Sequence, residues 1–322
     1  MMTLRQLWNR VREFFANRIA KPIATLLVKF PVILPANLLK NRRFLHVALG
    51  ICGAITILCI ILILQPIISS NRANEIYERM RADVILLPSV QPSPLVEAPT
   101  PTQEATPETI SEPTIPTDDP DFLREVDFET LWSETNADIY AWITIPNTRI
   151  DYPILQHPSD DSYYLNYNVD GTKGYPGCIY TERINAKDFS DFNTLIYGHN
   201  MKDGSMFRGL HDFADESFFA EHPYVYVFLP DRSLKYQVFA AHLFDDRHLM
   251  YVYDFANEEI QAAYLEEVLT STGKKTVLNK DISINAQDTI ITLSTCTSDS
   301  KNRYLVQAVL IEEFETKKDR NP

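Results

Sequence analysis

The sequence predicts a mainly β fold: a closed or nearly closed β-barrel with peripheral helices, preceded by a single transmembrane helix and a Pro/Thr-rich stalk. Three observations support this prediction. The second half of the chain holds many short strand-like runs and few helical ones, an apolar stretch without charge lies near the N-terminus, and a proline-rich segment separates the two. With 322 residues the chain has room for one domain of ordinary size plus appendages.

The apolar stretch runs from Phe44 to Leu64, FLHVALGICGAITILCIILIL, and contains no charged residue. Its 21 residues are enough to cross a hydrocarbon core of about 30 Å as a helix. It begins too far into the chain for a cleaved signal peptide, so we interpret residues 44–68 as a retained membrane anchor. A buried helix of a globular domain is the alternative, although such a helix usually carries charge on one face.

Charge is divided sharply between the two sides of this stretch. Residues 1–43 hold nine Lys and Arg side chains against one acid, Glu13, which gives +8; since the whole chain carries −13, the remainder carries −21. Positive charge before the span predicts a cytoplasmic N-terminus, with everything after residue 65 outside the membrane. The basic segment is either an amphipathic helix on the cytoplasmic leaflet or a solvated tail. The acidic remainder repels phosphate, which argues against nucleic acid as a partner.

The proline-rich segment lies between Pro88 and Pro120, with nine prolines, many Thr, Ser and Glu, and no Lys or Arg. Such a composition cannot bury enough apolar surface to fold, so residues 69–121 are predicted to form an extracytoplasmic stalk or linker. The run NRANEIYERMRADVILL before the prolines is expected to extend the membrane helix by a few turns.

A folded domain is predicted over residues 122–322. DFETLWSETNADIYAWITIP indicates a helix that leads into a strand, and NEEIQAAYLEEVLTS is a strong helix, with Ile260, Tyr264 and Val268 four residues apart. Many short strands with few helices favour a barrel. The further strand-like runs are RIDYPILQ, CIYTE, NTLIYG, YVYVFLP, LKYQVFAAHLF, DTIITLS and RYLVQAVLIEEF.

The residues able to carry chemistry gather at the last two strand-like runs. Side chains alternate along DTIITLSTC, so Ser294 and Cys296 share one face. If residues 297–302 close an antiparallel hairpin, Cys296 faces Arg303 with Cβ atoms about 5 Å apart. A guanidinium favours the reactive thiolate and can stabilise the oxyanion formed when it attacks a carbonyl. We therefore predict that Cys296 is a nucleophile; a buried, inert thiol is the alternative.

The remaining cysteines point to packing and not to a metal or a disulfide framework. Cys52 and Cys59 lie in the predicted span, which leaves two cysteines outside, enough for one disulfide at most. Cys178 sits in the strand-like run GCIY without a basic neighbour, so we expect it in the core. No Cys-X-X-Cys pair supports a structural zinc site.

A nucleophile that cleaves an amide needs an acid to protonate the leaving amine, and histidine is the usual one. His199 directly follows NTLIYG, where a strand end meets a loop and a side chain can reach a cleft. The other histidines of this part lie in turns, in an apolar strand or in polar connections. A solvent-facing loop histidine is the alternative interpretation of His199.

TLSTC followed by RYLV, together with IYGHNM, resembles the sortases, and specifically class B. The similarity extends over residues 122–314, through IPNTRIDYPILQ, DSYYLNYN and NTLIYGHNMKDGSMFRGL. It implies a sortase-type barrel and a cysteine transpeptidase that cleaves secreted proteins at a C-terminal, NPxTx-like sorting motif. The acyl group would pass to an amine of the peptidoglycan cross-bridge or, alternatively, of a pilin. Cys296 would be the nucleophile, His199 the general acid and base, and Arg303 the oxyanion ligand.

The resemblance also implies a substrate-binding wall that includes Asp161, Leu165, Ser294 and Thr295, with no cofactor and no metal. Asp161 departs from the family, since many members carry Asn there. The implied location is the cell membrane of a Gram-positive type envelope, with one pass and the catalytic domain outside. A non-catalytic, membrane-tethered binding scaffold is the alternative from another functional class. A papain-like protease would have its Cys before its His, which is the reverse of the order here.

Overall fold

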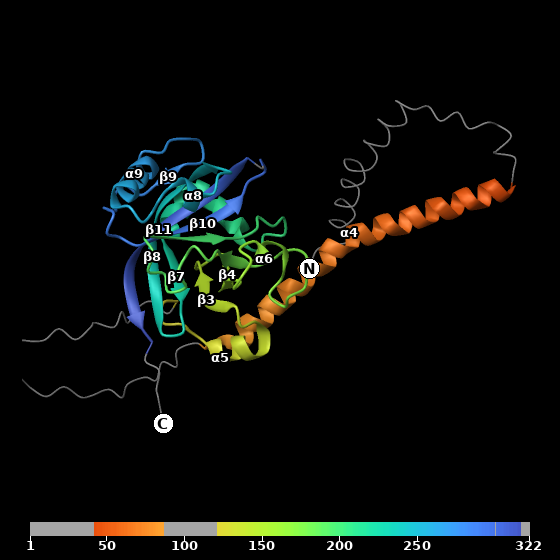
Figure 1. The fold of residues 1–322 in the computed structure, drawn as a ribbon, viewed down its shortest axis with the longest axis horizontal. Coiled ribbons are helices and arrows are strands. Elements are labelled where there is room, and N and C mark those ends of the chain that lie inside the picture. The colour runs from red at the N-terminus through yellow and green to blue at the C-terminus, as the bar shows by residue number, and fades with distance from the viewer. Residues whose placement is uncertain (1–41, 87–120, 300, 317–322) are drawn as a thin grey trace, which may run out of the picture. The chain divides into compact units, whose positions relative to one another are not determined.

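The computed structural model describes residues 42–86, 121–299 and 301–316 (Figure 1). The chain divides into two compact units, Met1–Ser70 and Asn71–Pro322, and the boundary falls within helix α4 (Arg42–Val84). The predictions for residues 1–41 of the basic segment and for the whole proline-rich segment fall outside the described residues.

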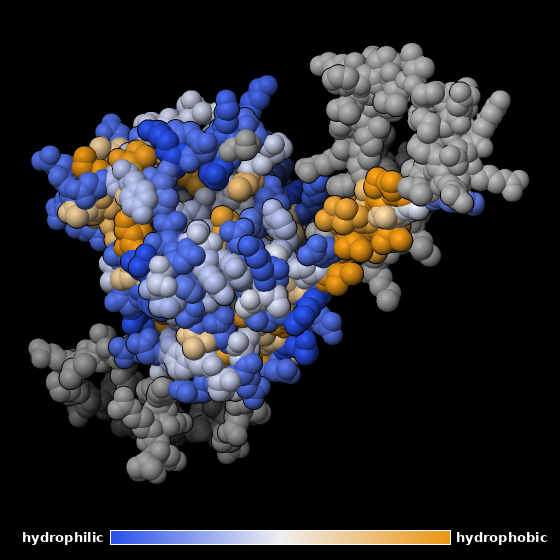
Figure 2. Space-filling view, turned by 45° about the vertical axis from the view of Figure 1, so that its right-hand side comes forward, coloured by the Kyte–Doolittle hydropathy of each residue, from blue (hydrophilic) through white to orange (hydrophobic). Residues whose placement is uncertain are grey.

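In the first unit, α4 presents an apolar surface. The helix holds a candidate membrane span within Gly53–Val84, long and apolar enough to cross a bilayer. Figure 2 shows hydrophobic side chains gathered on it. A helix that lacks a polar face over several turns needs apolar surroundings. The exposed large apolar residues among those described here are Ile51, Ile55, Ile57, Leu58, Ile60, Ile61, Leu62, Leu64 and Ile68.

The second unit is built on a closed, mixed β-barrel, as the sequence predicted. Among the described residues, eight strands follow the order β11-β10-β6-β5-β4-β3-β7-β8, and β8 pairs with β11 to close the ring. Neighbouring strands are antiparallel except for β4 with β5 and β6 with β10, which run parallel. The strands are β3 (Ile139–Thr144), β4 (Asp151–Leu155), β5 (Ile179–Thr181), β6 (Asn193–Tyr197), β7 (Tyr224–Phe228), β8 (Arg232–Asp245), β10 (Ile290–Cys296) and β11 (Asn302–Glu315).

Short helices surround the barrel, and β9 (Val277–Leu278) pairs with β8. Helix α9 is capped by Asn257, whose side chain accepts from the first-turn amides of Glu259 and Ile260. Its Tyr264, Leu265 and Val268 pack against β6, β8 and β10 in a second apolar cluster. The helices are α5 (Phe128–Thr130), η2 (Leu131–Thr135), α6 (Tyr163–Asn166), η3 (Phe207–Ala214), α7 (Glu216–Glu221), α8 (Leu249–Val252) and α9 (Glu258–Leu269).

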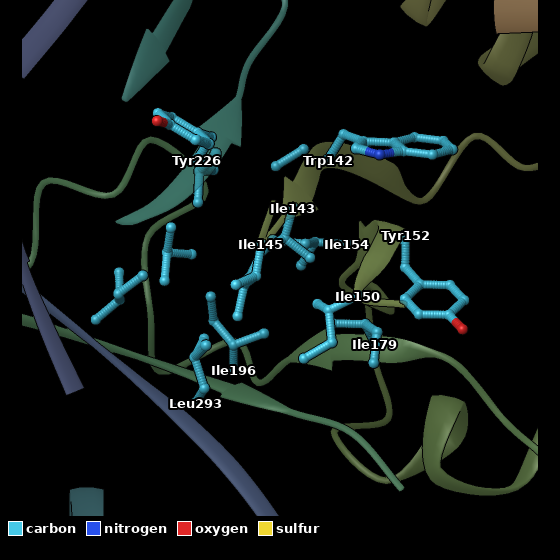
Figure 3. Packing of buried hydrophobic residues seen from close by; sticks show 14 of the residues in the cluster. Trp142, Ile143, Ile145, Ile150, Tyr152, Ile154, Ile179, Ile196, Tyr226 and Leu293 are labelled. Carbon is cyan, nitrogen blue, oxygen red and sulfur yellow. The ribbon is translucent and has the colours of Figure 1, made fainter. Parts of the chain in front are cut away.

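The main core lies inside the barrel, where alternate residues of the strands point inward. Figure 3 shows Ile143, Ile154 and Ile196 pointing toward one another, with Leu293 of β10 close by. All four side chains are fully buried. Since Leu293 points inward, the pleat turns its neighbours Ser294 and Thr292 to the other face of β10. The core thus decides which side chains of this strand face outward.

The C-terminal part of α4 belongs to the same unit as the barrel. Residues 71–84 bury Ala73, Tyr77, Met80 and Val84, spaced by four, three and four as one helix face requires. The Tyr77 hydroxyl donates to the Gly177 carbonyl at 3.3 Å. Further along the helix, Arg81 Nε donates to the Asp151 carbonyl at 2.9 Å.

The described residues on either side of the proline-rich segment are paired with each other. Strand β1 (Ile85–Leu86) pairs antiparallel with β2 (Glu125–Val126), so Leu86 lies opposite Glu125. The Asp127 amide adds a hydrogen bond of 3.0 Å to the Val84 carbonyl. The residues that flank the proline-rich segment are therefore neighbours. Residues 71–84 thus belong to the same compact unit as the barrel.

Candidate active site

Cys296 is the last residue of β10, which lies between β11 and β6. Its antiparallel register with β11 places Cys296 directly opposite Arg303, as the hairpin prediction required. Cys296 is exposed, whereas the six preceding residues of the strand are buried. The thiol thus stands where the strand leaves the core, with a half-buried guanidinium beside it.

His199 reaches the other side of Cys296 because β6 runs parallel to β10. Tyr197 is the register partner of Ser294 and the last residue of β6, so His199 follows the paired part of this strand by two residues. The ladder continues past the end of β6, since the Gly198 amide donates to the Ser294 carbonyl at 3.1 Å. Cys296 and Arg303 are thus paired on two strands and His199 follows the end of a third, neighbouring strand; we call these three residues the reactive row.

Gly198 makes this close approach sterically possible. A Cβ at this position would lie 2.5 Å from Ile179 Cδ1 and 2.6 Å from the Phe207 ring, distances that Cβ atoms do not adopt. The Gly198 carbonyl accepts a hydrogen bond of 2.7 Å from the Thr295 hydroxyl. This glycine therefore lets the histidine-bearing loop pack tightly against the barrel and the nucleophile strand.

The His199 ring is oriented by a backbone carbonyl. Its Nε2 lies 2.8 Å from the carbonyl oxygen of Leu165, in α6. A carbonyl oxygen only accepts, so Nε2 carries the proton. Nδ1 is then the ring nitrogen left for proton transfer. The ring of Tyr175 lies beside the imidazole, with centroids 5.3 Å apart.

The residues predicted for the substrate-binding wall fall into different environments. Leu165 is exposed, and its carbonyl oxygen contacts His199. Ser294 and Thr295 are buried, and Thr295 holds the loop after β6. Asp161 instead binds Arg183 with both oxygens at 3.0 Å, and these hydrogen bonds lower the pKa of its carboxyl group. The structure ties Asp161 to the segment after β5.

A polar group at the ends of β5 and β6 was missed in the sequence. The Tyr180 ring stacks on Tyr197, with centroids 5.3 Å apart. The Tyr197 hydroxyl lies 3.0 Å from His248 Nε2, which also contacts a Glu182 carboxylate oxygen at 2.6 Å. Burial raises the pKa of Glu182, and the adjacent imidazole opposes this shift. The signal available in the sequence was Tyr197, two residues before His199 and so on the same face.

Tyr180 lies within electrostatic range of the reactive row. Burial raises the pKa of its phenol, and Glu182 and Cys296 add to this shift. Arg303 opposes it. Through Tyr197, which pairs with both Tyr180 and Ser294, the stacked tyrosines are linked to β10 two residues before Cys296.

Two further residues missed in the sequence contact the backbone of Cys296. Asn200 Nδ2 lies 2.8 Å, and His211 Nε2 3.0 Å, from the Cys296 carbonyl oxygen. In the sequence His211 lies in a polar connection. No local pattern there indicates that its side chain contacts the Cys296 carbonyl.

The row can perform nucleophilic acyl transfer. A thiol is the attacking group, a guanidinium can receive negative charge that develops on a carbonyl oxygen, and an imidazole can move protons. Within the part of the chain that the structure describes, no group of three or more His, Cys, Asp and Glu side chains is arranged to hold a metal ion. The closed barrel and this row define a class of protein, the cysteine acyltransferases.

Comparisons with known proteins agree with this class. The sortase domain family matches residues 143–311. Sortase B of Listeria monocytogenes is 35% identical over 179 residues, which cover 55% of this chain and 71% of that protein. The structure of the Staphylococcus aureus sortase B–substrate complex has 30% identity and a TM-score of 0.51, covering 58% of this chain and 85% of that one. Clostridium perfringens sortase B has 28% identity and a TM-score of 0.50, covering 55% and 96%.

The chain therefore belongs to the sortase family, in its class B, and is a cysteine transpeptidase.

Proposed function

We propose that this enzyme cleaves secreted proteins at a C-terminal, NPxTx-like sorting motif and transfers them to an amine of the peptidoglycan cross-bridge. The observation that supports the proposal most directly is the reactive row of Arg303, Cys296 and His199. The solved Staphylococcus aureus relative is a sortase B–substrate complex, which supports a substrate-binding site in this part of the chain.

The proposed reaction has two acyl transfers. Cys296 Sγ bonds to the carbonyl carbon of the motif's Thr, and the electron pair moves to the oxygen, where Arg303 stabilises it. When the C–N bond breaks, His199 donates a proton to the leaving amine through Nδ1, since Nε2 is bound to Leu165. The incoming amine then attacks the thioester, its proton passes to His199, and the C–S bond breaks to restore the thiolate.

We further propose that residues 44–68 anchor the enzyme in the cell membrane, with the basic N-terminal segment inside and the catalytic domain outside. The exposed apolar residues of α4 support an anchor, and the nine basic residues before it support this orientation. We take the catalytic unit to begin at Asn71 and not at residue 122, because residues 71–86 pack and pair with the rest of the domain. Substrates would reach this enzyme as they leave the secretion machinery.

The test uses the full-length chain in detergent with a quenched NPQTN-type peptide. We expect cleavage that a thiol-alkylating reagent and Cys296→Ala both abolish. Adding a cross-bridge-like peptide amine should yield a ligated product, and a pilin-type lysine peptide in a parallel reaction asks whether that amine is preferred. No cleavage of any sorting-type peptide, with Cys296 unreactive toward the reagent, would instead support a non-catalytic binding scaffold.

A further inference from the structure

The carbonyl oxygen of Cys296 accepts hydrogen bonds from two side chains. Asn200 Nδ2 lies at 2.8 Å and His211 Nε2 at 3.0 Å. Because the oxygen only accepts, both nitrogens donate, and His211 carries its proton on Nε2. Asn200 Nδ2 and His211 Nε2 also lie within hydrogen-bonding distance of each other, at 2.9 Å, so the two side chains and the Cys296 carbonyl form one polar cluster.

These donors continue the parallel ladder after the strand has ended. The last backbone bond of that ladder runs from the Gly198 amide to the Ser294 carbonyl. In a parallel ladder the acceptors on one edge recur every two residues, so the Cys296 carbonyl is the next acceptor. Beyond His199 the chain turns to form a bridge between Asn200 and Met206. Side chains therefore supply the hydrogen bonds that the strand no longer provides.

The His211 ring is itself held in place. It stacks on the Tyr304 ring, with centroids 5.2 Å apart and planes inclined by 23°. Tyr304 is fully buried, pairs with Thr295 across the hairpin, and donates its hydroxyl to the Lys275 carbonyl at 3.0 Å. The donor on η3 is thus fixed against β11, the strand that also carries Arg303.

We propose that Asn200 and His211 are positioning residues of the transpeptidase, which hold the backbone of Cys296 and keep its thiol in register with His199. Asn200 directly follows His199 in the chain. Its hydrogen bond to the Cys296 carbonyl therefore links the backbone next to His199 with the backbone of Cys296. The inference rests on the proposed function for its kinetic test. Small displacements of a nucleophile matter, since about 1 Å can change a rate by about 10²-fold.

The experiment compares four proteins, each as the full-length chain in detergent, with kcat expressed per titrated Cys296 thiol. His211→Phe keeps an aromatic ring but removes the donor, while His211→Gln keeps an N–H donor. His222→Phe is the matched control, because His222 also stacks on an aromatic ring, with centroids 4.0 Å apart, and binds a backbone carbonyl, both of Phe218. Hydrogen exchange over residues 290–303 is measured on the same samples.

We expect His211→Phe to lower kcat by about 3- to 10-fold, the range that one net hydrogen bond represents, with KM nearly unchanged. His211→Gln should recover part of this loss, and His222→Phe should match the wild type. Hydrogen exchange at the end of β10 should rise in His211→Phe alone. A merely structural role would lower the number of titrated thiols but leave kcat per thiol unchanged.

Equal kcat per thiol in His211→Phe and His222→Phe overturns the inference. The inference is also overturned if kcat per thiol of His211→Gln is as low as that of His211→Phe. The hydrogen-bond donor at position 211 would then have no effect on the rate. If the wild type cleaves no peptide, the proposed function fails separately. Hydrogen exchange then tests whether His211 holds the backbone of Cys296. Unchanged exchange at the end of β10 in His211→Phe would contradict the inference.

Discussion

Cys178 and Cys296 show how one kind of side chain takes opposite roles in two regions of the barrel. Cys178 precedes β5, is fully buried, and directs its S–H toward the Tyr167 carbonyl at 3.4 Å. Burial raises the pKa of this thiol. Cys296 is exposed at the end of β10, opposite Arg303. The difference teaches that reactivity here comes from the place where a strand leaves the core, and not from the residue type.

The largest expected effect concerns the reaction of the two thiols with an alkylating reagent. Cys296 should be labelled in the folded enzyme, whereas Cys178 reacts only after the barrel opens, so the rates should differ by about 10³-fold or more. Peptide mapping scores each cysteine separately. Comparable rates for the two thiols would contradict the comparison, and labelling in denaturant serves as the control for complete reaction.

The second prediction concerns the guanidinium beside Cys296. Arg303→Ala should lower kcat/KM for peptide cleavage by about 10²- to 10³-fold, because the developing oxyanion loses its charged partner. Arg232→Ala is the matched control, since Arg232 stands at the other end of the barrel strands and binds Asp231 and the Asp188 carbonyl. A similar loss in both variants would indicate a structural role for Arg303.

The third prediction applies one substitution to both cysteines and measures urea unfolding. Cys178→Ala should lower the free energy of unfolding by about 1 kcal/mol, since it leaves a small void in the core, with kcat per titrated thiol unchanged. Cys296→Ala should change the free energy of unfolding by less than about 0.5 kcal/mol while it abolishes cleavage. Loss of activity in Cys178→Ala would show that the two regions are coupled.

The smallest effect concerns the backbone behind Cys296. Burial lowers the pKa of His211 below its ordinary value of 6.5, and the nearby Arg208 and Lys275 act in the same direction, while the bond to Cys296 opposes them. As pH falls through about 6.5, the unfolded chain takes up a proton that the folded chain does not, so stability declines. His211→Phe removes this contribution. Its Tm should therefore fall less between about pH 7 and pH 5 than that of the wild type, and equal slopes would contradict the prediction.

The sequence predicted the barrel and the pairing of Cys296 with Arg303 because both depend on local patterns. Alternation along β10 and β11 fixes the register that pairs Cys296 with Arg303, and the hairpin between them is short. His199 could be found because it directly follows a strand-like run. The contacts of Asn200 and His211 could not, since both reach a backbone oxygen 96 and 85 residues away, and any residue type offers that acceptor.

The docked part of α4 illustrates another limit. The spacing of Ala73, Tyr77, Met80 and Val84 was visible as a helix face, but charged neighbours and the prolines that follow favoured a linker. What decides its packing is distant, namely the carbonyls of Gly177 and Asp151. Asp161 is a similar case, because its partner Arg183 lies 22 residues away in a segment without any distinctive pattern.

The pairing of β1 with β2 has a consequence for how the molecule tolerates changes in the proline-rich segment. The 38 residues between Leu86 and Glu125 are an excursion whose two flanking residues are paired with each other. The entropy of closing such an excursion varies slowly with its length, by about 0.6 kcal/mol for each doubling. Insertions or deletions there should leave catalysis intact. A protease that nicks the excursion would leave the barrel attached to residues 71–86 through side-chain contacts and β pairing, without a peptide bond.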